Sequence, residues 1–147
     1  MINQKIKTNH KLGIVAPYRD REDQLLLFTQ AIKDYIKDID YELIIVDQQR
    51  KNDFNRGKLL NIGFLKAEEL GCDYVIFHDL DMLPIDVDYS YSDEVVHLVD
   101  ELIMPEGFDR KNFDEYFGGV TLFPAETFKA INGYSNEYYG WGFEDDN

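Results

Sequence analysis

Short apolar runs alternate with amphipathic stretches along the first half of the chain. Leu12–Ala16, Glu42–Val46 and Cys72–His78 are rich in strand-favouring residues and have the length of buried strands. Between them, Glu22–Ile39 and Arg56–Leu70 carry apolar residues at helical spacing, with charges at the other positions. Strands that alternate with helices form right-handed crossovers and a parallel sheet. We therefore expect an α/β fold with a mainly parallel central sheet, helices on both faces, and the first three strands ending at one edge.

The second half of the chain is less regular. Residues 85–115 are acidic and rich in tyrosine, and the apolar positions of 95–103 fit either a strand or a helix. Order returns after Gly118-Gly119 with the apolar run Val120–Phe123, which predicts another strand. Pro124 favours the start of a short helix over Ala125–Ile131.

The composition is that of one globular domain. A chain of 147 residues with 44% hydrophobic residues is long enough for a single core, and we expect a polar tail at 1–11 and one domain at 12–147. No apolar run reaches membrane-spanning length. The single cysteine, Cys72, excludes internal disulfides and multi-cysteine zinc sites, and fits a reducing compartment.

Charge is distributed unevenly along the chain. The net charge is −14, which argues against a nucleic-acid partner. Residues 1–66 carry a net charge of +3, whereas residues 67–147 carry −17. This asymmetry fits an anionic ligand bound to the first half and bridged by a metal ion to the second, although ordinary acidic solubility would produce it as well.

Candidate chemistry lies at the ends of the predicted strands. Asp79 and Asp81 follow the third strand, at the edge where open α/β sheets bind ligands. Two such acids suit a hard divalent cation, particularly one that a diphosphate also binds, but a solvated polar turn has the same sequence. Arg19 and Arg21 lie at the first strand-to-helix turn, and Arg56 begins the second helix, where an anion would favour basic residues.

Six collinear motifs resemble the β-1,4-galactosyltransferase family, whose members are inverting, metal-dependent enzymes with a GT-A fold. The resemblance covers nearly the whole chain from Leu12 onward. Its motifs are Val15–Arg21 (VAPYRDR), Phe54–Phe64 (FNRGKLLNIGF), Phe77–Pro84 (FHDLDMLP), Tyr116–Val120 (YFGGV), Ile131–Tyr134 (INGY) and Gly140–Asp146 (GWGFEDD).

The resemblance implies a nucleotide-binding half at 12–84 and a half for the donor sugar and acceptor at 85–147. The implied partners are a UDP-sugar donor and a saccharide or glycoconjugate acceptor, and the implied cofactor is Mn²⁺, bound by Asp81. Asp145 matches the catalytic base, and Tyr116 matches a position where tyrosine accompanies unsubstituted galactose. The implied donor-binding residues are Pro17, Tyr18, Arg19, Arg21, Phe54, Asn55, Arg56, Asp79, Leu80, Asp81 and Tyr116. The implied acceptor-binding residues are Trp141, Gly142, Phe143, Glu144, Asp145 and Asp146.

The expected function is therefore transfer of galactose from UDP-galactose to a sugar hydroxyl, in polysaccharide or glycoconjugate synthesis. Alternatives are a transferase that uses UDP-N-acetylgalactosamine, a UDP- or glycan-binding domain with impaired catalysis, and a phosphohydrolase with Asp79 as nucleophile, which Met82-Leu83 disfavours. In the family a histidine beyond the acidic motif also binds the metal, and His78 is interpreted here as a structural residue instead. We expect a cytoplasmic enzyme that builds a surface polysaccharide, either free or peripheral to the membrane where that polysaccharide is made.

Overall fold

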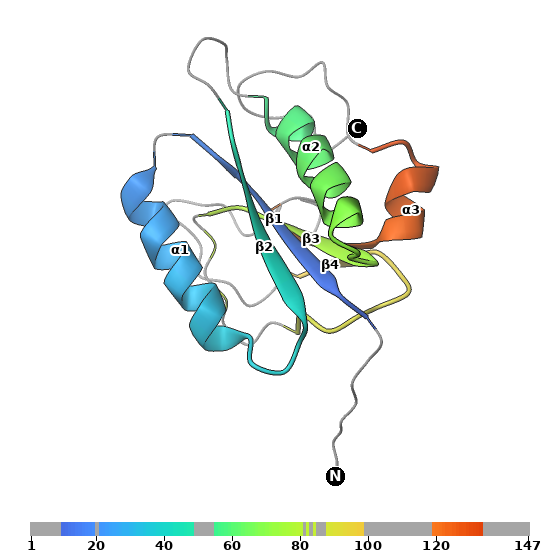
Figure 1. Cartoon of the computed structure of the whole chain (residues 1–147), viewed down its shortest axis with the longest axis horizontal. Coiled ribbons are helices and arrows are strands. Elements are labelled where there is room, and N and C mark those ends of the chain that lie inside the picture. Colours follow the sequence, from blue (N-terminus) through green and yellow to red (C-terminus); the bar gives the residue numbers. More distant parts are fainter. Residues whose placement is uncertain are drawn as a thin grey trace, which may run out of the picture.

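The computed structural model describes residues 10–19, 21–48, 55–80, 82, 84, 88–98 and 119–133. Within these ranges the chain forms a five-stranded sheet with strand order β2-β1-β3-β5-β4 (Figure 1). The strands are β1 (Leu12–Tyr18), β2 (Tyr41–Asp47), β3 (Tyr74–His78), β4 (Val96–His97) and β5 (Val120–Pro124). The helices are α1 (Glu22–Tyr35), α2 (Arg56–Glu69) and α3 (Ala125–Ala130).

The sheet is mixed. β1 lies between β2 and β3 and pairs with both in parallel, which confirms the topology predicted for the first three strands. β5 pairs antiparallel with β3 and with the short β4. The carboxyl ends of β1, β2 and β3 therefore share one edge, whereas β5 begins at that edge and runs away from it.

Element boundaries differ from the sequence prediction at several points. α1 ends at Tyr35, because Ile36 already has an extended backbone, although the apolar pattern continues to Ile39. β1 continues beyond Ala16 to Tyr18, so that Pro17 lies within the strand and pairs with Val46. In the region that fitted either a strand or a helix, Val96 and His97 form a short strand.

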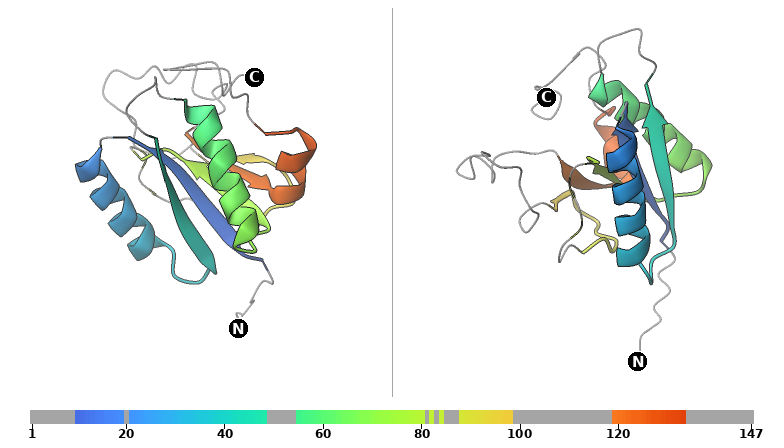
Figure 2. Two further views of the ribbon diagram at one scale, coloured as in Figure 1. Left: turned by 45° about the horizontal axis from the view of Figure 1, so that its top comes forward. Right: turned by 90° about the vertical axis from the view of Figure 1, so that its left-hand side faces the viewer.

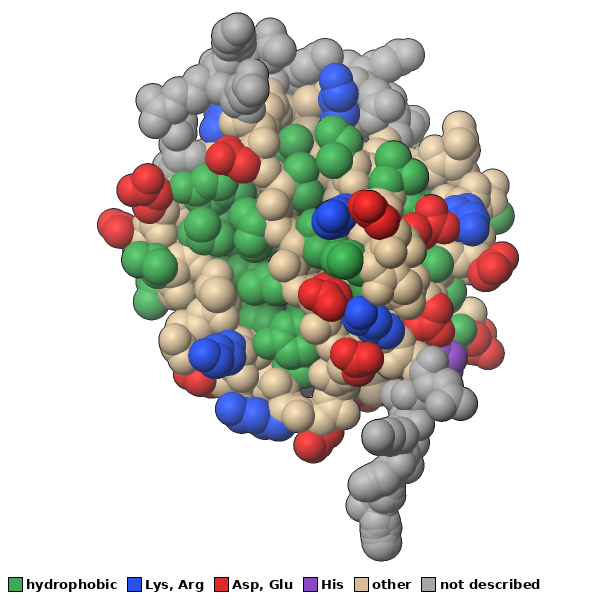
Figure 3. All heavy atoms as spheres, viewed as in Figure 1, with side chains coloured by type: hydrophobic (Ala, Val, Ile, Leu, Met, Phe, Trp, Pro, Cys, Tyr) green, Lys and Arg blue, Asp and Glu red, His purple; other side chains and the backbone are tan. Residues whose placement is uncertain are grey.

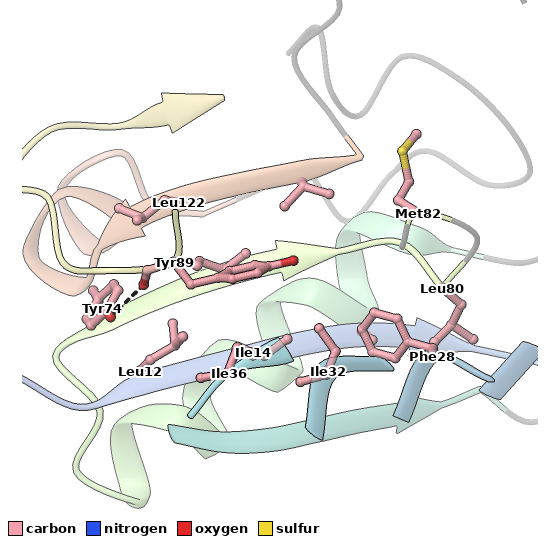
Figure 4. Close-up of a cluster of buried hydrophobic side chains, with 13 residues drawn as sticks. Leu12, Ile14, Phe28, Ile32, Ile36, Tyr74, Leu80, Met82, Tyr89 and Leu122 are labelled. Carbon is pink, nitrogen blue, oxygen red and sulfur yellow. Dashed lines mark hydrogen bonds between the residues drawn. The ribbon is translucent and has the colours of Figure 1, made fainter. Parts of the chain in front are cut away.

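Helices cover both faces of the sheet, as predicted. Alternate residues of β1 point to opposite faces. Ile14 packs in one core cluster with Phe28 and Ile32 of α1, and Val15 packs in the other with Phe64 of α2 and Phe128 of α3. The two views in Figure 2 show α1 on one side of the sheet and α2 on the other, and Figure 4 shows the cluster beneath α1.

A glycine brings α2 close to the sheet. A Cβ atom added to Gly63 would overlap Cγ1 of Val15 and lie 3.0 Å from Cγ2 of Val46. Only a residue without a side chain fits at this contact. The contact sets the depth at which α2 packs against β1 and β2, and therefore the place of its first residue, Arg56.

The surface carries charged and apolar residues together. In the face drawn in Figure 3, hydrophobic side chains are visible over α1 and between α1 and β2, and charged side chains gather over α2. Leu26 and Leu27 of α1 are 71% and 65% exposed. Among the described residues, no helix combines the length and the apolar character that crossing a membrane requires.

Candidate functional site

The candidate site begins where the three parallel strands end. Tyr18 and Asp47 are the last paired residues of β1 and β2, and His78 is the last residue of β3. Arg19, Gln48 and Asp79 follow these strands directly. The first residue of α2, Arg56, reaches the same edge, since its side chain contacts Asp79.

An ion pair joins the start of α2 to the end of β3. Nε of Arg56 donates a hydrogen bond to Oδ1 of Asp79 over 3.0 Å. The Arg56 side chain is 5% exposed and its Nη2 is buried, whereas the Asp79 side chain is 21% exposed. A buried guanidinium at a helix start is costly unless negative charge lies next to it. The Asp79 carboxylate provides such charge on one side of the guanidinium.

A chain of hydrogen bonds fixes the start of α2 against the strand ends. Oδ1 of Asn55 accepts from the backbone N–H of Lys58 over 2.9 Å, so Asn55 caps α2. The backbone N–H of Asn55 donates to Oε1 of Gln48 over 2.8 Å, and the N–H of Gln48 donates to the carbonyl oxygen of Tyr18 over 3.1 Å. Arg56 is therefore placed by a cap and by two strand ends.

Gln48 is a residue that the sequence analysis missed. Its side chain acts on Asn55, seven positions later, across a loop that sequence periodicity does not describe. The available signal was an amide residue directly after a predicted strand, at the edge where the candidate site lies.

His78 is fully buried and has hydrogen-bond partners for both ring nitrogens. Nδ1 lies 2.9 Å from the carbonyl oxygen of Asp79, and Nε2 lies 2.8 Å from the hydroxyl of Tyr89. Burial lowers the pKa of His78 from 6.5 to about 4, and the carbonyl of Asp79 offsets this only in part. His78 is therefore neutral at pH 7, and its contacts confirm the structural interpretation.

The other predicted donor-binding residues in the described part of the chain occupy different environments. Arg19 is partly exposed after β1. Arg21 is exposed before α1, and its Nη1 donates to Oε1 of Gln24 over 3.3 Å. The side chain of Leu80 is buried in the core cluster beneath α1.

Several predicted site residues lie outside the described ranges. They are Phe54, Asp81, Tyr116, Trp141, Gly142, Phe143, Glu144, Asp145 and Asp146. In the ranges that are described, no three His, Cys, Asp or Glu side chains gather into a group that could hold a metal ion. The described site thus consists of the strand edge, the Arg56–Asp79 pair and the hydrogen bonds that place them.

Comparison with known proteins assigns the chain and its fold to a class. Residues 3–93 match the family model "N-terminal region of glycosyl transferase group 7", and residues 105–147 match "N-terminal domain of galactosyltransferase". Among solved structures, a mutant of the Drosophila β-1,4-galactosyltransferase 7 in complex with manganese, UDP-Gal and xylobiose is 33% identical and has a TM-score of 0.80. That match covers 93% of this chain and 58% of the other. The class is that of group 7 glycosyltransferases with the GT-A fold.

Curated relatives identify the family. The xylosylprotein 4-β-galactosyltransferase of Caenorhabditis elegans is 32% identical over 139 residues, which are 93% of this chain and 48% of the relative. The mouse β-1,4-galactosyltransferase 4 is 37% identical over 148 residues, a match that covers 97% of this chain and 42% of the relative. The chain belongs to the β-1,4-galactosyltransferase family, and it spans less than half the length of these curated relatives.

Proposed function

We propose that this chain carries the nucleotide-sugar site of an inverting, metal-dependent galactosyltransferase, which moves galactose from UDP-galactose to a sugar hydroxyl. The observation that carries the proposal is the Arg56–Asp79 ion pair at the carboxyl edge of the parallel strands. It combines a nearly buried cation, a helix start and a partly exposed carboxylate at the edge where α/β folds bind nucleotides.

The donor side of the reaction needs positive charge. When UDP leaves, negative charge develops on the diphosphate, and groups that are already oriented toward it lower the barrier. Arg56 is fixed by Asp79 and by the capped start of α2, so it can meet this charge without reorganising. Arg19 and Arg21, between β1 and α1, are proposed to contribute further positive charge.

The donor set at this edge fits a hard divalent cation. Asp79 presents carboxylate oxygens with 21% of its side chain exposed, and Asp81 follows two residues later in the sequence. Oxygen ligands of this kind suit Mn²⁺, and Asp81 is its proposed ligand. The bound ion supplies positive charge to the diphosphate. The Drosophila relative was solved with manganese and UDP-Gal, which supports this assignment.

The acceptor side is proposed from the family motifs. Asp145 acts as the general base, and it removes a proton from the acceptor hydroxyl as the oxygen attacks the anomeric carbon opposite the leaving UDP. One displacement inverts that carbon and requires no protein nucleophile. Trp141, Gly142 and the remaining acids of the same motif bind the acceptor sugar.

The experiment measures UDP release from UDP-galactose with and without Mn²⁺, over a panel of acceptors that includes N-acetylglucosamine, glucose and xylose. We expect Mn²⁺-dependent release that requires an acceptor and is lost in Asp145→Asn. Glu126→Gln is the matched control, because it removes one negative charge from an exposed position on α3 and should leave turnover unchanged.

The other outcomes separate the alternatives. Faster turnover with UDP-N-acetylgalactosamine than with UDP-galactose would contradict the role proposed for Tyr116. Mn²⁺-dependent binding of UDP without turnover would favour a nucleotide-binding domain. Absence of UDP binding with Mn²⁺ present would refute the proposed function.

A further inference from the structure

A buried tyrosine outside every motif of the sequence analysis lies behind the candidate site. Tyr89 is 2% exposed and packs in the core cluster beneath α1. Its hydroxyl contacts Nε2 of His78 over 2.8 Å, and its backbone carbonyl accepts a hydrogen bond from the hydroxyl of Tyr74 over 2.8 Å. Figure 4 shows Tyr89 beside Tyr74, with the latter hydrogen bond drawn. The segment 88–98 is thereby attached to β3 through polar groups in the core.

The hydrogen bonds of His78 have one direction. The carbonyl oxygen of Asp79 only accepts, so the proton of the neutral imidazole lies on Nδ1 and is donated to that oxygen. Nε2 then carries the lone pair, and the hydroxyl of Tyr89 donates to it. The ring is also held against Phe28, with centroids 4.8 Å apart in an edge-to-face contact. Both the tautomer and the orientation of His78 are therefore fixed by its neighbours.

The fixed ring of His78 in turn holds the backbone carbonyl of Asp79. Its carbonyl also accepts from the backbone N–H of Met82 over 3.3 Å, which closes the turn after β3. Its own N–H donates to the carbonyl of Gly119 over 2.7 Å. Both backbone polar groups of Asp79 are thus held, and its side chain extends from this fixed point to Arg56.

We propose that His78 and Tyr89 are positioning residues, which orient the Asp79 peptide. This orientation places the Asp79 carboxylate beside Arg56 and the turn that follows β3 beside the nucleotide sugar. The nucleotide part rests on the proposed function. The pair acts through hydrogen bonds: Tyr89 selects the tautomer of His78, and His78 holds the carbonyl from which the turn begins. A role that only fills the core would need the rings but not their polar atoms.

Tyr89→Phe tests the role of the Tyr89 hydroxyl, which contacts His78, and Tyr74→Phe is the matched control. Each substitution removes one buried hydroxyl from the same network, but Tyr74 donates to a backbone carbonyl and does not contact His78. The first measurement is NMR of ¹⁵N-labelled full chain, which reports the tautomer of His78 and the hydrogen exchange of the Asp79 and Met82 amides. It requires no nucleotide.

We expect the Nδ1–H tautomer in the unmodified chain. In Tyr89→Phe, the two amides should exchange about ten times faster than in Tyr74→Phe, because His78 loses the hydroxyl that fixes its tautomer and then holds the Asp79 carbonyl less firmly. Titration of UDP in the presence of Mn²⁺ should show affinity about three- to tenfold weaker in Tyr89→Phe, and within about twofold of the unmodified chain in Tyr74→Phe.

The results separate this inference from the proposed function. If the unmodified chain does not bind UDP, the proposed function fails, while the exchange rates still decide the role of His78 and Tyr89. An Nε2–H tautomer, or equal amide exchange in the two variants, would overturn the inference. If Tyr89→Phe does not fold, His78→Asn and His78→Gln replace it. Asn places an amide near the Nδ1 position and should protect the Met82 amide better than Gln, and equal protection would also overturn the inference.

Discussion

Gly63→Ala is the most direct test of how the sheet places the candidate site. Gly63 lies two helical turns after Arg56 on α2, at the contact with β1 and β2. In an isolated helix, alanine is favoured over glycine by about 1 kcal/mol. In this fold we expect alanine to be destabilising instead, because its methyl group would enter space that valine side chains already occupy.

The magnitude follows from the contacts of that methyl group. It would overlap Cγ1 of Val15, which is fully buried, and lie 3.0 Å from Cγ2 of Val46. Both neighbours are β-branched and have few alternative rotamers, so the helix itself must shift. Such overpacking costs about 1–3 kcal/mol, and after the gain of about 1 kcal/mol in helix propensity we expect a net loss of up to about 2 kcal/mol.

Denaturant unfolding and UDP binding with Mn²⁺ measure the two consequences. We expect a lower unfolding midpoint and weaker UDP binding, since a shifted α2 carries Arg56 away from Asp79. Val15→Ala supplies the control by removing the obstructing methyl groups. When Gly63→Ala and Val15→Ala are combined, the loss in the free energy of unfolding should be smaller than the sum of the two single losses, by about 1 kcal/mol or more. A Gly63→Ala chain more stable than the unmodified one, or strictly additive effects, would refute the packing argument.

Three further predictions concern the site itself. Asp79→Asn should weaken UDP binding in the presence of Mn²⁺ and cost about 1–3 kcal/mol of stability, because the buried Arg56 side chain loses the negative charge of Asp79; titration and denaturant unfolding measure both. As the pH is lowered from 6.5 to about 4, the free energy of unfolding should fall by about 1.4 kcal/mol per pH unit more than it does in His78→Asn. The reason is that the unfolded chain binds the His78 proton near pH 6.5 and the folded chain only near pH 4. Asn55→Ala should lose about 1 kcal/mol in thermal or denaturant unfolding through loss of the cap on Lys58, and unchanged stability would contradict that role.

The sequence predicted the strands well because burial on both faces leaves continuous apolar runs. The side chains of Leu12, Ile14, Val75 and Ile76 are all fully buried. The same signal misled at the end of α1. Ile36 has helical spacing and is 7% exposed, yet its backbone is extended, since the pattern reports which side chains face the core and not the backbone that brings them there.

The candidate site was predictable only in part. Asn55, Arg56 and Asp79 could be found because strand ends and helix starts have local signatures. Gln48 and Tyr89 could not, because their hydrogen bonds join residues that are seven and eleven positions apart across irregular segments. Such contacts depend on where tertiary packing places a loop, which periodicity does not encode.

The strand order also has a consequence for synthesis of the chain. β3 lies inside the sheet, between β1 and β5. Its second hydrogen-bonding partner, β5, comes much later in the sequence. On the ribosome, β1 to β3 emerge first and can assemble with α1 and α2 before β5 exists. During that interval the apolar run Tyr74–Phe77 forms an open edge, which favours pairing with other chains. Nascent chains should therefore be most prone to aggregate after β3 has emerged and before β5 has, and chaperone binding should concentrate in that window.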